Sequence, residues 1–236
     1  MYSSFYAAAR GVIAQQQKLD VTANNLANIN NYGYKNKSVS FSNLMYYNMN
    51  NQYGQDTAMK AGTGVKVEMT NTDFTPEAYT ETDGAYDFAI GGKGFFRLVN
   101  PSSDAVTYTR NGHFSLSQQG NQFYLVNDAG NRVCDRNGNP VIVNNGTFSG
   151  EIGIYQFNIT DGMQSVGDNE FAPTAKNGTP FLVQDGKLIR HALETSGVDM
   201  AEEMTKLIES QRAYSFALRI VQTSDEIVNT VNSLRQ

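Results

Sequence analysis

The amino-acid sequence predicts an α+β fold in which a long helix at each end of the chain flanks a central all-β module. Two observations support this prediction: apolar residues recur with a helical period near both ends, and short β-branched and aromatic runs alternate with turn residues in the middle. A chain of 236 residues can bury one good core and a small second one, so we expect one or two domains.

The N-terminal helix is expected over about residues 3–29, because small or apolar residues follow a heptad rhythm there. These positions form one seam along the helix: Tyr2, Phe5, Ala9, Val12, Gln16, Leu19, Ala23 and Leu26. Gln16 is the only one of them that is neither small nor apolar. Asn30, Asn31 and Gly33 then supply the turn or left-handed conformations that end a helix.

Three asparagines, Asn24, Asn25 and Asn28, lie in the last turns of this helix, where each is poorer than alanine by up to ~0.7 kcal/mol. Our interpretation is that they fix the register between helices, because a buried or interfacial asparagine can form hydrogen bonds across helices. A fraying helix end that merely tolerates them is the alternative that stays open.

The C-terminal helix is expected to begin near Asp199 and to extend for roughly 37 residues. Ser196 and Asp199 have the spacing at which each side chain can cap a free backbone N–H group of the other, and Glu202 and Glu203 suit the positive end of the helix dipole. Two apolar seams follow: the first contains Met200, Met204, Leu207, Gln211, Tyr214, Leu218, Val221 and Val228, and the second Ala213, Ala217, Ile220, Ile227, Val231 and Leu234.

The middle of the chain contains seven Asn-Gly or Asp-Gly steps between residues 83 and 186, which favour the positive φ angles of tight hairpin turns. Strands are expected in the runs at residues 86–90, 94–99, 122–126 and 151–155. We therefore divide the chain into an N-terminal helical segment (1–35), an extended connector with a few strands (36–80), the β module (81–192) and a C-terminal helical segment (193–236).

The composition argues against several partners. Only 17% of the residues are charged and the net charge is −5, so neither nucleic acid nor a membrane surface is an expected partner. No segment approaches the ~20 apolar residues of a membrane span, and the N-terminus lacks a signal-peptide pattern, which taken alone predicts a cytoplasmic protein. Cys134 is the single cysteine, so no intramolecular disulfide is possible.

No pattern of catalytic, metal or cofactor chemistry is convincing. The segment Gly91-Gly92-Lys93-Gly94 lacks the spacing of a phosphate-binding loop and predicts a β-turn. His113, His191 and Cys134 share no short metal-ligand spacing, and residues 135–139 lack the downstream acidic ligand of a calcium loop and predict a hairpin. The sequence therefore predicts no enzyme and no cofactor.

A carbohydrate-binding β module that uses Tyr108, Phe123 or Tyr124 is the alternative from another functional class, although aromatic residues at alternate strand positions are more often in a core.

Two long helices with apolar seams must find partners, because an exposed stripe of that size would aggregate. The C-terminal helix has more apolar surface than one partner helix can cover, so we expect it to pack against several neighbours. The residues expected at an assembly interface are Phe5, Val12, Leu19, Asn24, Asn25, Leu26, Asn28, Leu207, Gln211, Arg212, Tyr214, Leu218, Ile220, Val221, Ile227 and Val228.

Several motifs closely resemble those of the flagellar rod and hook family of axial proteins. They lie at residues 11–35, 87–96, 108–115, 193–198 and 208–214 and so cover most of the chain. The length and the Gly62-Thr63-Gly64-Val65 stretch look most like the distal rod protein, while the short connector before it leaves the proximal rod protein open. This sequence has Asn30-Asn31 where the family usually has Asn-Thr, Ser196-Gly197 where it has Ser-Asn, and no asparagine directly after Tyr214.

The resemblance implies that the terminal helices pair into an inner coiled-coil layer around a central channel, with the β module outside. It also implies partners: copies of the same chain, other rod and hook proteins, and the flagellar export apparatus, which passes subunits without signal cleavage. The function it implies is that of a structural subunit of the bacterial basal body, which polymerises into a hollow shaft and transmits torque to the hook.

Overall fold

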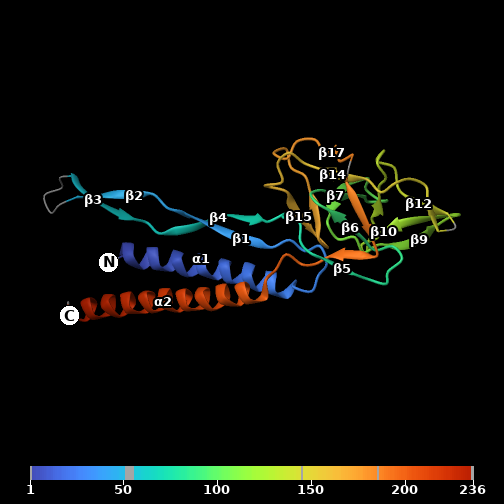
Figure 1. Ribbon diagram of the computed structural model, residues 1–236. Coiled ribbons are helices and arrows are strands. Elements are labelled where there is room, and N and C mark those ends of the chain that lie inside the picture. Colours follow the sequence, from blue (N-terminus) through green and yellow to red (C-terminus); the bar gives the residue numbers. More distant parts are fainter. Residues whose placement is uncertain (1, 51–55, 145, 185, 235–236) are drawn as a thin grey trace. The chain divides into compact units, whose positions relative to one another are not determined.

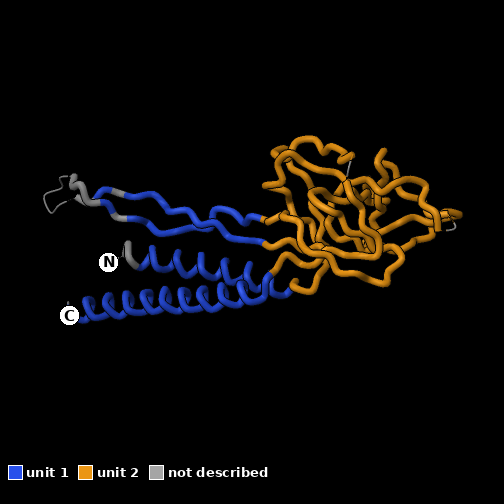
Figure 2. The backbone as a smooth tube through the Cα atoms, in the orientation of Figure 1, with its two compact units in different colours: residues 1–27, 37–71, 199–236 blue, residues 28–36, 72–198 orange. Residues whose placement is uncertain are grey.

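The computed structural model describes residues 2–50, 56–144, 146–184 and 186–234, and it confirms an α+β fold with a helix near each end of the chain and a large β body formed by residues between them in the sequence (Figure 1). The chain divides into two compact units (Figure 2). Unit 1 contains residues 1–27, 37–71 and 199–236, and unit 2 contains residues 28–36 and 72–198.

Unit 1 contains both long helices, α1 (Tyr2–Ala27) and α2 (Met200–Ser233), which pack side by side (Figure 1). They are antiparallel, because Asn25 near the end of α1 bonds to Glu203 near the start of α2. Both helices lie within a few residues of the predicted ranges.

The expected capping by Ser196 is wrong. The Asp199 carboxylate alone accepts the N–H groups of Ala201 and Glu202, while the Ser196 hydroxyl donates to the carbonyl of Asn28.

A β ribbon accompanies α1 in the same unit (Figure 1). It is formed by β1 (Lys37–Asn43), β2 (Tyr46–Asn50), β3 (Asp56–Gly62) and β4 (Val65–Thr72), with β1 paired to β4 and β2 antiparallel to β3. The polar segment expected to be extended with a few strands is therefore largely a two-stranded ribbon. Its period was hard to recognise because both of its faces are partly exposed.

Unit 2 is the β body. Its main sheet has the order β13-β12-β10-β11-β7-β8-β16-β15, with β14 on β7, β17 on β14 and β9 on β10, and two small pairs, β18-β6 and β19-β5, complete it. The bounds are β5 (Tyr79–Glu81), β6 (Phe88–Gly91), β7 (Phe95–Val99), β8 (Val106–Thr109), β9 (Ser115–Gln119), β10 (Gln122–Val126), β11 (Arg132–Val133), β12 (Ile142–Asn144), β13 (Thr147–Phe148), β14 (Ile154–Gln156), β15 (Gln164–Gly167), β16 (Glu170–Ala172), β17 (Phe181–Leu182), β18 (Lys187–Arg190) and β19 (Ala192–Glu194).

Strand β7 separates two hydrophobic cores. Phe96 and Leu98 point into the larger core, whereas Phe95, on the other face of the strand, belongs to an aromatic core with Tyr108 and Phe157. This follows from the alternation of side chains along a strand, which makes a run with large apolar groups on both faces fit only between two buried layers. The expected role of Tyr108 as a core residue is confirmed.

The glycines of the Asn-Gly and Asp-Gly steps serve two different purposes. Four of them have positive φ angles as expected, namely Gly138, Gly146, Gly162 and Gly178. Gly84, Gly112 and Gly186 do not, so the expected tight turn is wrong for the steps at 83–84 and 111–112. The steps at 145–146 and 185–186 each include a residue outside those that the structure describes. The reason is steric: a Cβ on Gly112 would lie 1.6 Å from the carbonyl oxygen of Phe88, so only glycine fits this close backbone approach.

Because Cys134 is buried, the unfolding free energy of the chain should decrease at alkaline pH. Burial raises the pKa of this thiol from 9.0 to about 11, so between these values the unfolded chain loses a proton that the folded chain keeps. Stability therefore falls as pH rises through this window. We expect Cys134→Val to remove roughly 2 kcal/mol of the loss in unfolding free energy between about pH 8 and pH 11, as measured by urea denaturation. An equal loss in both chains would contradict this.

Candidate assembly site

The least exposed positions of α2 form a stripe that lies against α1. Their spacing alternates between four and three residues, which keeps one side of a helix toward a neighbour. We call these positions the inner seam: Glu203, Leu207, Ser210, Tyr214, Ala217, Val221, Ser224 and Val228. The predicted first seam shares Leu207, Tyr214, Val221 and Val228 with the inner seam. The other members of the inner seam are polar or small residues, which an apolar pattern does not detect. The pattern therefore included exposed positions such as Met204.

Asn25 links three parts of unit 1. Its amide nitrogen donates to the Glu203 carboxylate (3.1 Å) and to the carbonyl of Lys37 (2.7 Å), and its amide oxygen accepts the N–H of Lys37 (3.1 Å). Glu203 is buried and is also paired with Lys206 at 2.8 Å. Asparagine suits this position because its amide donates two hydrogen bonds and accepts one, whereas a hydroxyl group has only one proton to donate. These bonds, each worth about 1 kcal/mol, outweigh its poor helix propensity.

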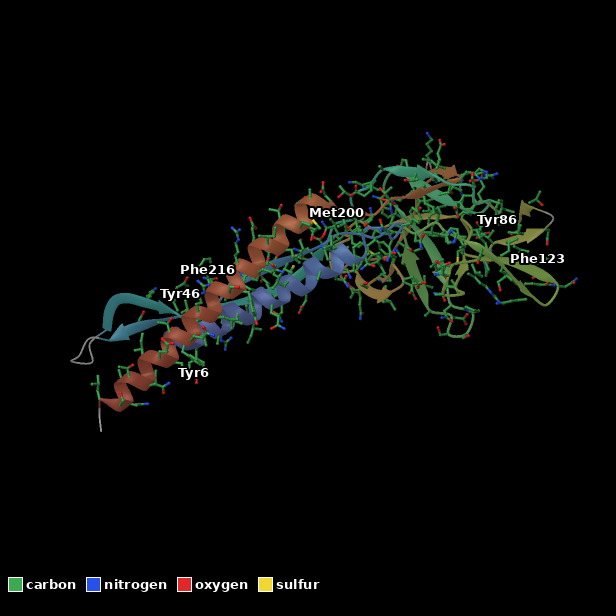
Figure 3. All side chains as sticks on the ribbon, turned by 90° about the horizontal axis from the view of Figure 1, so that it is seen from below. Tyr6, Tyr46, Tyr86, Phe123, Met200 and Phe216 are labelled. Atoms are coloured by element: carbon green, nitrogen blue, oxygen red, sulfur yellow. The ribbon has the colours of Figure 1, made fainter. Side chains whose placement is uncertain are left out.

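The distal half of α2 has a second, exposed apolar face. Its members recur at intervals of three, four or seven residues, so at 3.6 residues per turn they lie on one side of the helix, about a quarter turn from the inner seam. We call it the outer face: Phe216, Ile220, Ile227, Val231 and Leu234, which are between 37% and 81% exposed. Phe216 is labelled in Figure 3. Such a face is unfavourable in water, so it is a candidate contact surface.

The residues expected at an assembly interface are distributed over buried and exposed positions. Asn25 is buried. Those that are half-buried are Phe5, Val12, Leu19, Leu26, Asn28, Leu207, Tyr214, Leu218, Val221 and Val228. Those that are exposed are Asn24, Gln211, Arg212, Ile220 and Ile227. Their role between copies of the chain stays a prediction.

Three motifs that are far apart in the sequence meet in unit 2 around a buried charge cluster, formed by Lys35, Arg110 and Glu194. The Lys35 ammonium donates to Glu194 Oε1 at 2.7 Å, and Arg110 donates from Nε to Glu194 Oε2 at 2.7 Å and from Nη2 to Oε1 at 3.1 Å. The side chains of all three are at most 1% exposed. Arg110 also donates from Nη1 to the carbonyls of Gly92 and Gly94, so all three nitrogen atoms of its guanidinium form hydrogen bonds.

Glu194 is the central member of this cluster because it neutralises charge on both sides. It accepts, in addition, the backbone N–H of Glu77 at 2.9 Å. Burial lowers the pKa of the Lys35 ammonium below its usual range, and Glu194 partly offsets this by attraction and by its hydrogen bond. Without Glu194, two cations would be buried side by side.

Gly33 allows the N-terminal motif to approach this cluster. Its φ is +66°, and a Cβ would lie 2.5 Å from the backbone nitrogen of Asn111, so no other residue fits. Its N–H donates to the carbonyl of Glu194 at 2.9 Å, and the carbonyl of Tyr34 accepts the N–H of Gly197. Sequence reasoning recognised the motifs separately but missed this junction. The available signal was that Lys35, Arg110 and Glu194 are charged residues within the motifs of a chain that has few charged residues.

Within the residues that the structure describes, no group of three or more His, Cys, Asp or Glu side chains is arranged to hold a metal ion. The helices in the same residues are also not long and apolar enough to cross a membrane.

The chain has a helix near each of its ends, an antiparallel β body, and sequence motifs joined by a buried charge cluster, and its sequence matches family models of one class of proteins. Family models match at three places: "Flagella basal body rod protein" over residues 5–35, "Flagellar hook protein FlgE/F/G D1 domain" over residues 89–167, and "Flagellar basal body rod FlgEFG protein C-terminal" over residues 189–234. The chain belongs to the flagellar basal-body rod protein family, as its motifs predicted.

Curated relatives agree over nearly the whole chain. The flagellar basal-body rod protein FlgG of Buchnera aphidicola subsp. Schizaphis graminum is 31% identical over 99% of this chain and 100% of its own length. FlgG of Caulobacter vibrioides is 31% identical over 97% of each chain. A second rod protein of Caulobacter vibrioides, FlgF, is 30% identical over 96% of this chain and 95% of its own.

Proposed function

We propose that this protein is a structural subunit of the bacterial flagellar basal-body rod, which self-assembles into a hollow shaft and transmits torque to the hook. The observation that carries this proposal is the outer face of α2, which a lone chain leaves in water. The names of the relatives, basal-body rod proteins, support the same function.

The mechanism we propose is assembly through the terminal helices. Within one chain, α1 and α2 pack along the inner seam, whose members are buried or half-buried, so the outer face is available for other copies in a coiled-coil layer around a channel. Burying one such apolar side chain contributes about 1.5–3 kcal/mol, and this contribution recurs whenever a subunit is added. In this arrangement the β body lies outside the helical layer.

Partners and location follow from this proposal. The chain would contact copies of itself, other rod and hook proteins, and the flagellar export apparatus, through which it would pass without cleavage of a signal peptide. The distal part of the rod is the proposed position, and a proximal rod or hook-type subunit is the alternative. Within the segments 1–35 and 193–236, the helices α1 and α2 would form the helical layer; the segment 36–80 would be the connector and 81–192 the β module.

Cryo-electron microscopy of isolated basal bodies tests the proposal. A small tag inserted after Ser103, in the exposed turn between β7 and β8, should leave the core of unit 2 intact. We expect repeated tag density along the rod, and its distance from the hook distinguishes the distal from the proximal position. Basal bodies with a normal rod and no tag density, from cells that produce the tagged chain, would contradict the proposal.

A further inference from the structure

Unit 2 contains a polar pocket of about 530 Å³ next to the buried charge cluster. It is lined by six asparagines together with Asp128, Asp168, His113, Thr109 and Tyr32, so every lining side chain is polar. Lysine and arginine are absent from this lining, which consists entirely of residues that the structure describes. The pocket therefore brings neutral polar groups and two carboxylates together, and it lies outside α1 and α2, although Asn28 is also one of the residues expected at the assembly interface.

Several of these groups are held in place by hydrogen bonds. Asn169 donates its amide to the carbonyl of Tyr32 at 3.0 Å, and its own carbonyl accepts the hydroxyl of Thr109 at 2.8 Å. His113 Nδ1 lies 2.9 Å from the carboxylate of Asp87. Because a carboxylate can only accept, Nδ1 carries a proton in this contact. The pocket is thus organised before any ligand is present.

The turn between β15 and β16 contributes two lining residues in an unfavourable backbone conformation. Asp168 and Asn169 have φ angles of 48° and 57°, a region that glycine adopts more readily than any residue with a Cβ. The strain brings a carboxylate and an amide to the pocket at adjacent positions. Such strained residues are common at ligand sites.

We propose that this pocket binds a neutral saccharide of one or two units. Hydroxyl groups both donate and accept, so they can form hydrogen bonds to amides, carboxylates and an imidazole, and a site built in this way rejects ligands without hydroxyls. The ring of Tyr32, which is 41% exposed, offers a flat surface to one face of a sugar. This is not the site suggested by the aromatic strand residues, since Tyr108 is buried and Phe123 is outside the pocket.

Other ligand classes fit the pocket less well. An anionic phosphate would meet two carboxylates and no lysine or arginine in the lining. A tightly bound cation would need more acidic ligands than the described residues bring together. A protein segment would find no apolar recess for an anchor residue, which is the main source of affinity at protein interfaces.

Titration of the full chain, labelled with nitrogen-15, tests the proposal by NMR. The probes are two neutral disaccharides, N,N′-diacetylchitobiose and maltose. We expect at least one of them to give saturable shifts of the Asn111 and Asn169 side-chain amides with a Kd of about 1 mM or lower. Asp168→Gly should weaken this binding about tenfold or more, because it removes a charged acceptor while glycine relaxes the turn.

Asp104→Gly is the matched control, since Asp104 also has a positive φ (53°) but lies in an exposed turn outside the pocket. It should leave binding unchanged, and Asp128→Asn should weaken it without altering the backbone. The absence of saturable shifts with both disaccharides, or equal weakening by Asp104→Gly and Asp168→Gly, would overturn the proposal. So would saturation by calcium alone, or pocket shifts that depend only on protein concentration, which would indicate a second copy of the chain.

Discussion

Replacing Glu194 with glutamine is expected to lower the unfolding free energy of unit 2 by about 3–5 kcal/mol, although the two side chains have nearly the same shape. The substitution removes the carboxylate that pairs with both the Lys35 ammonium and the Arg110 guanidinium, and it leaves these two cations buried beside each other. The measurement is urea denaturation followed by circular dichroism of the β body.

Glu151→Gln is the matched control, because Glu151 also pairs with an arginine, Arg136, but its side chain is 75% exposed. It should cost less than about 1 kcal/mol. The double variant Lys35→Met with Glu194→Gln should be more stable than Glu194→Gln alone, because one buried cation is removed. Equal costs for the two glutamate variants would show that the buried charge cluster contributes no more than a surface ion pair.

Ile220→Asp is expected to abolish rod formation and motility while leaving the isolated chain as stable as before, within about 0.5 kcal/mol of the control. Ile220 is 53% exposed in the isolated chain, so a carboxylate there stays hydrated. In a polymer that buries the outer face, an unpaired carboxylate costs several kcal/mol at every subunit contact. Motility in soft agar and electron microscopy of basal bodies give the readout.

Gln222→Asp is the control for this variant. It adds the same charge two residues further along, on the opposite side of α2, where the residue is exposed and not part of the outer face. Gln222→Asp should lower the helix propensity of α2 by about as much as Ile220→Asp does, and the variant chain should still assemble. Normal rods with Ile220→Asp, or loss of rods with both variants, would mean that the outer face does not mediate assembly.

The sequence predicted both helices and some of the strands, because helical and strand periods depend on neighbouring residues. Both terminal helices and the strands around residues 95–99 and 122–126 were found in this way. The inner seam was found only in part, because Glu203 and Ser210 are polar residues at buried positions. A buried glutamate becomes acceptable only through Asn25 and Lys206, and the first of these partners is 178 residues away.

Long-range pairing also explains why the junction in unit 2 was missed. Lys35 and Glu194 are separated by 159 residues, and no local pattern indicates that they meet. The role of Gly112 could not be predicted either, because the group that excludes a side chain there is the carbonyl of Phe88 on another strand. The motifs were recognisable as a set, but the contacts that require each residue became visible only in the folded chain.

Site-directed photocrosslinking at position 220 tests the central claim, assembly through the outer face of α2, most directly. A photoreactive amino acid at this position should give covalent adducts between two copies of the chain, or between the chain and another rod protein, in isolated basal bodies. The same group at position 222, or at position 220 in the dispersed chain, should give none. Assembled basal bodies in which position 220 forms no intermolecular adduct would contradict the account.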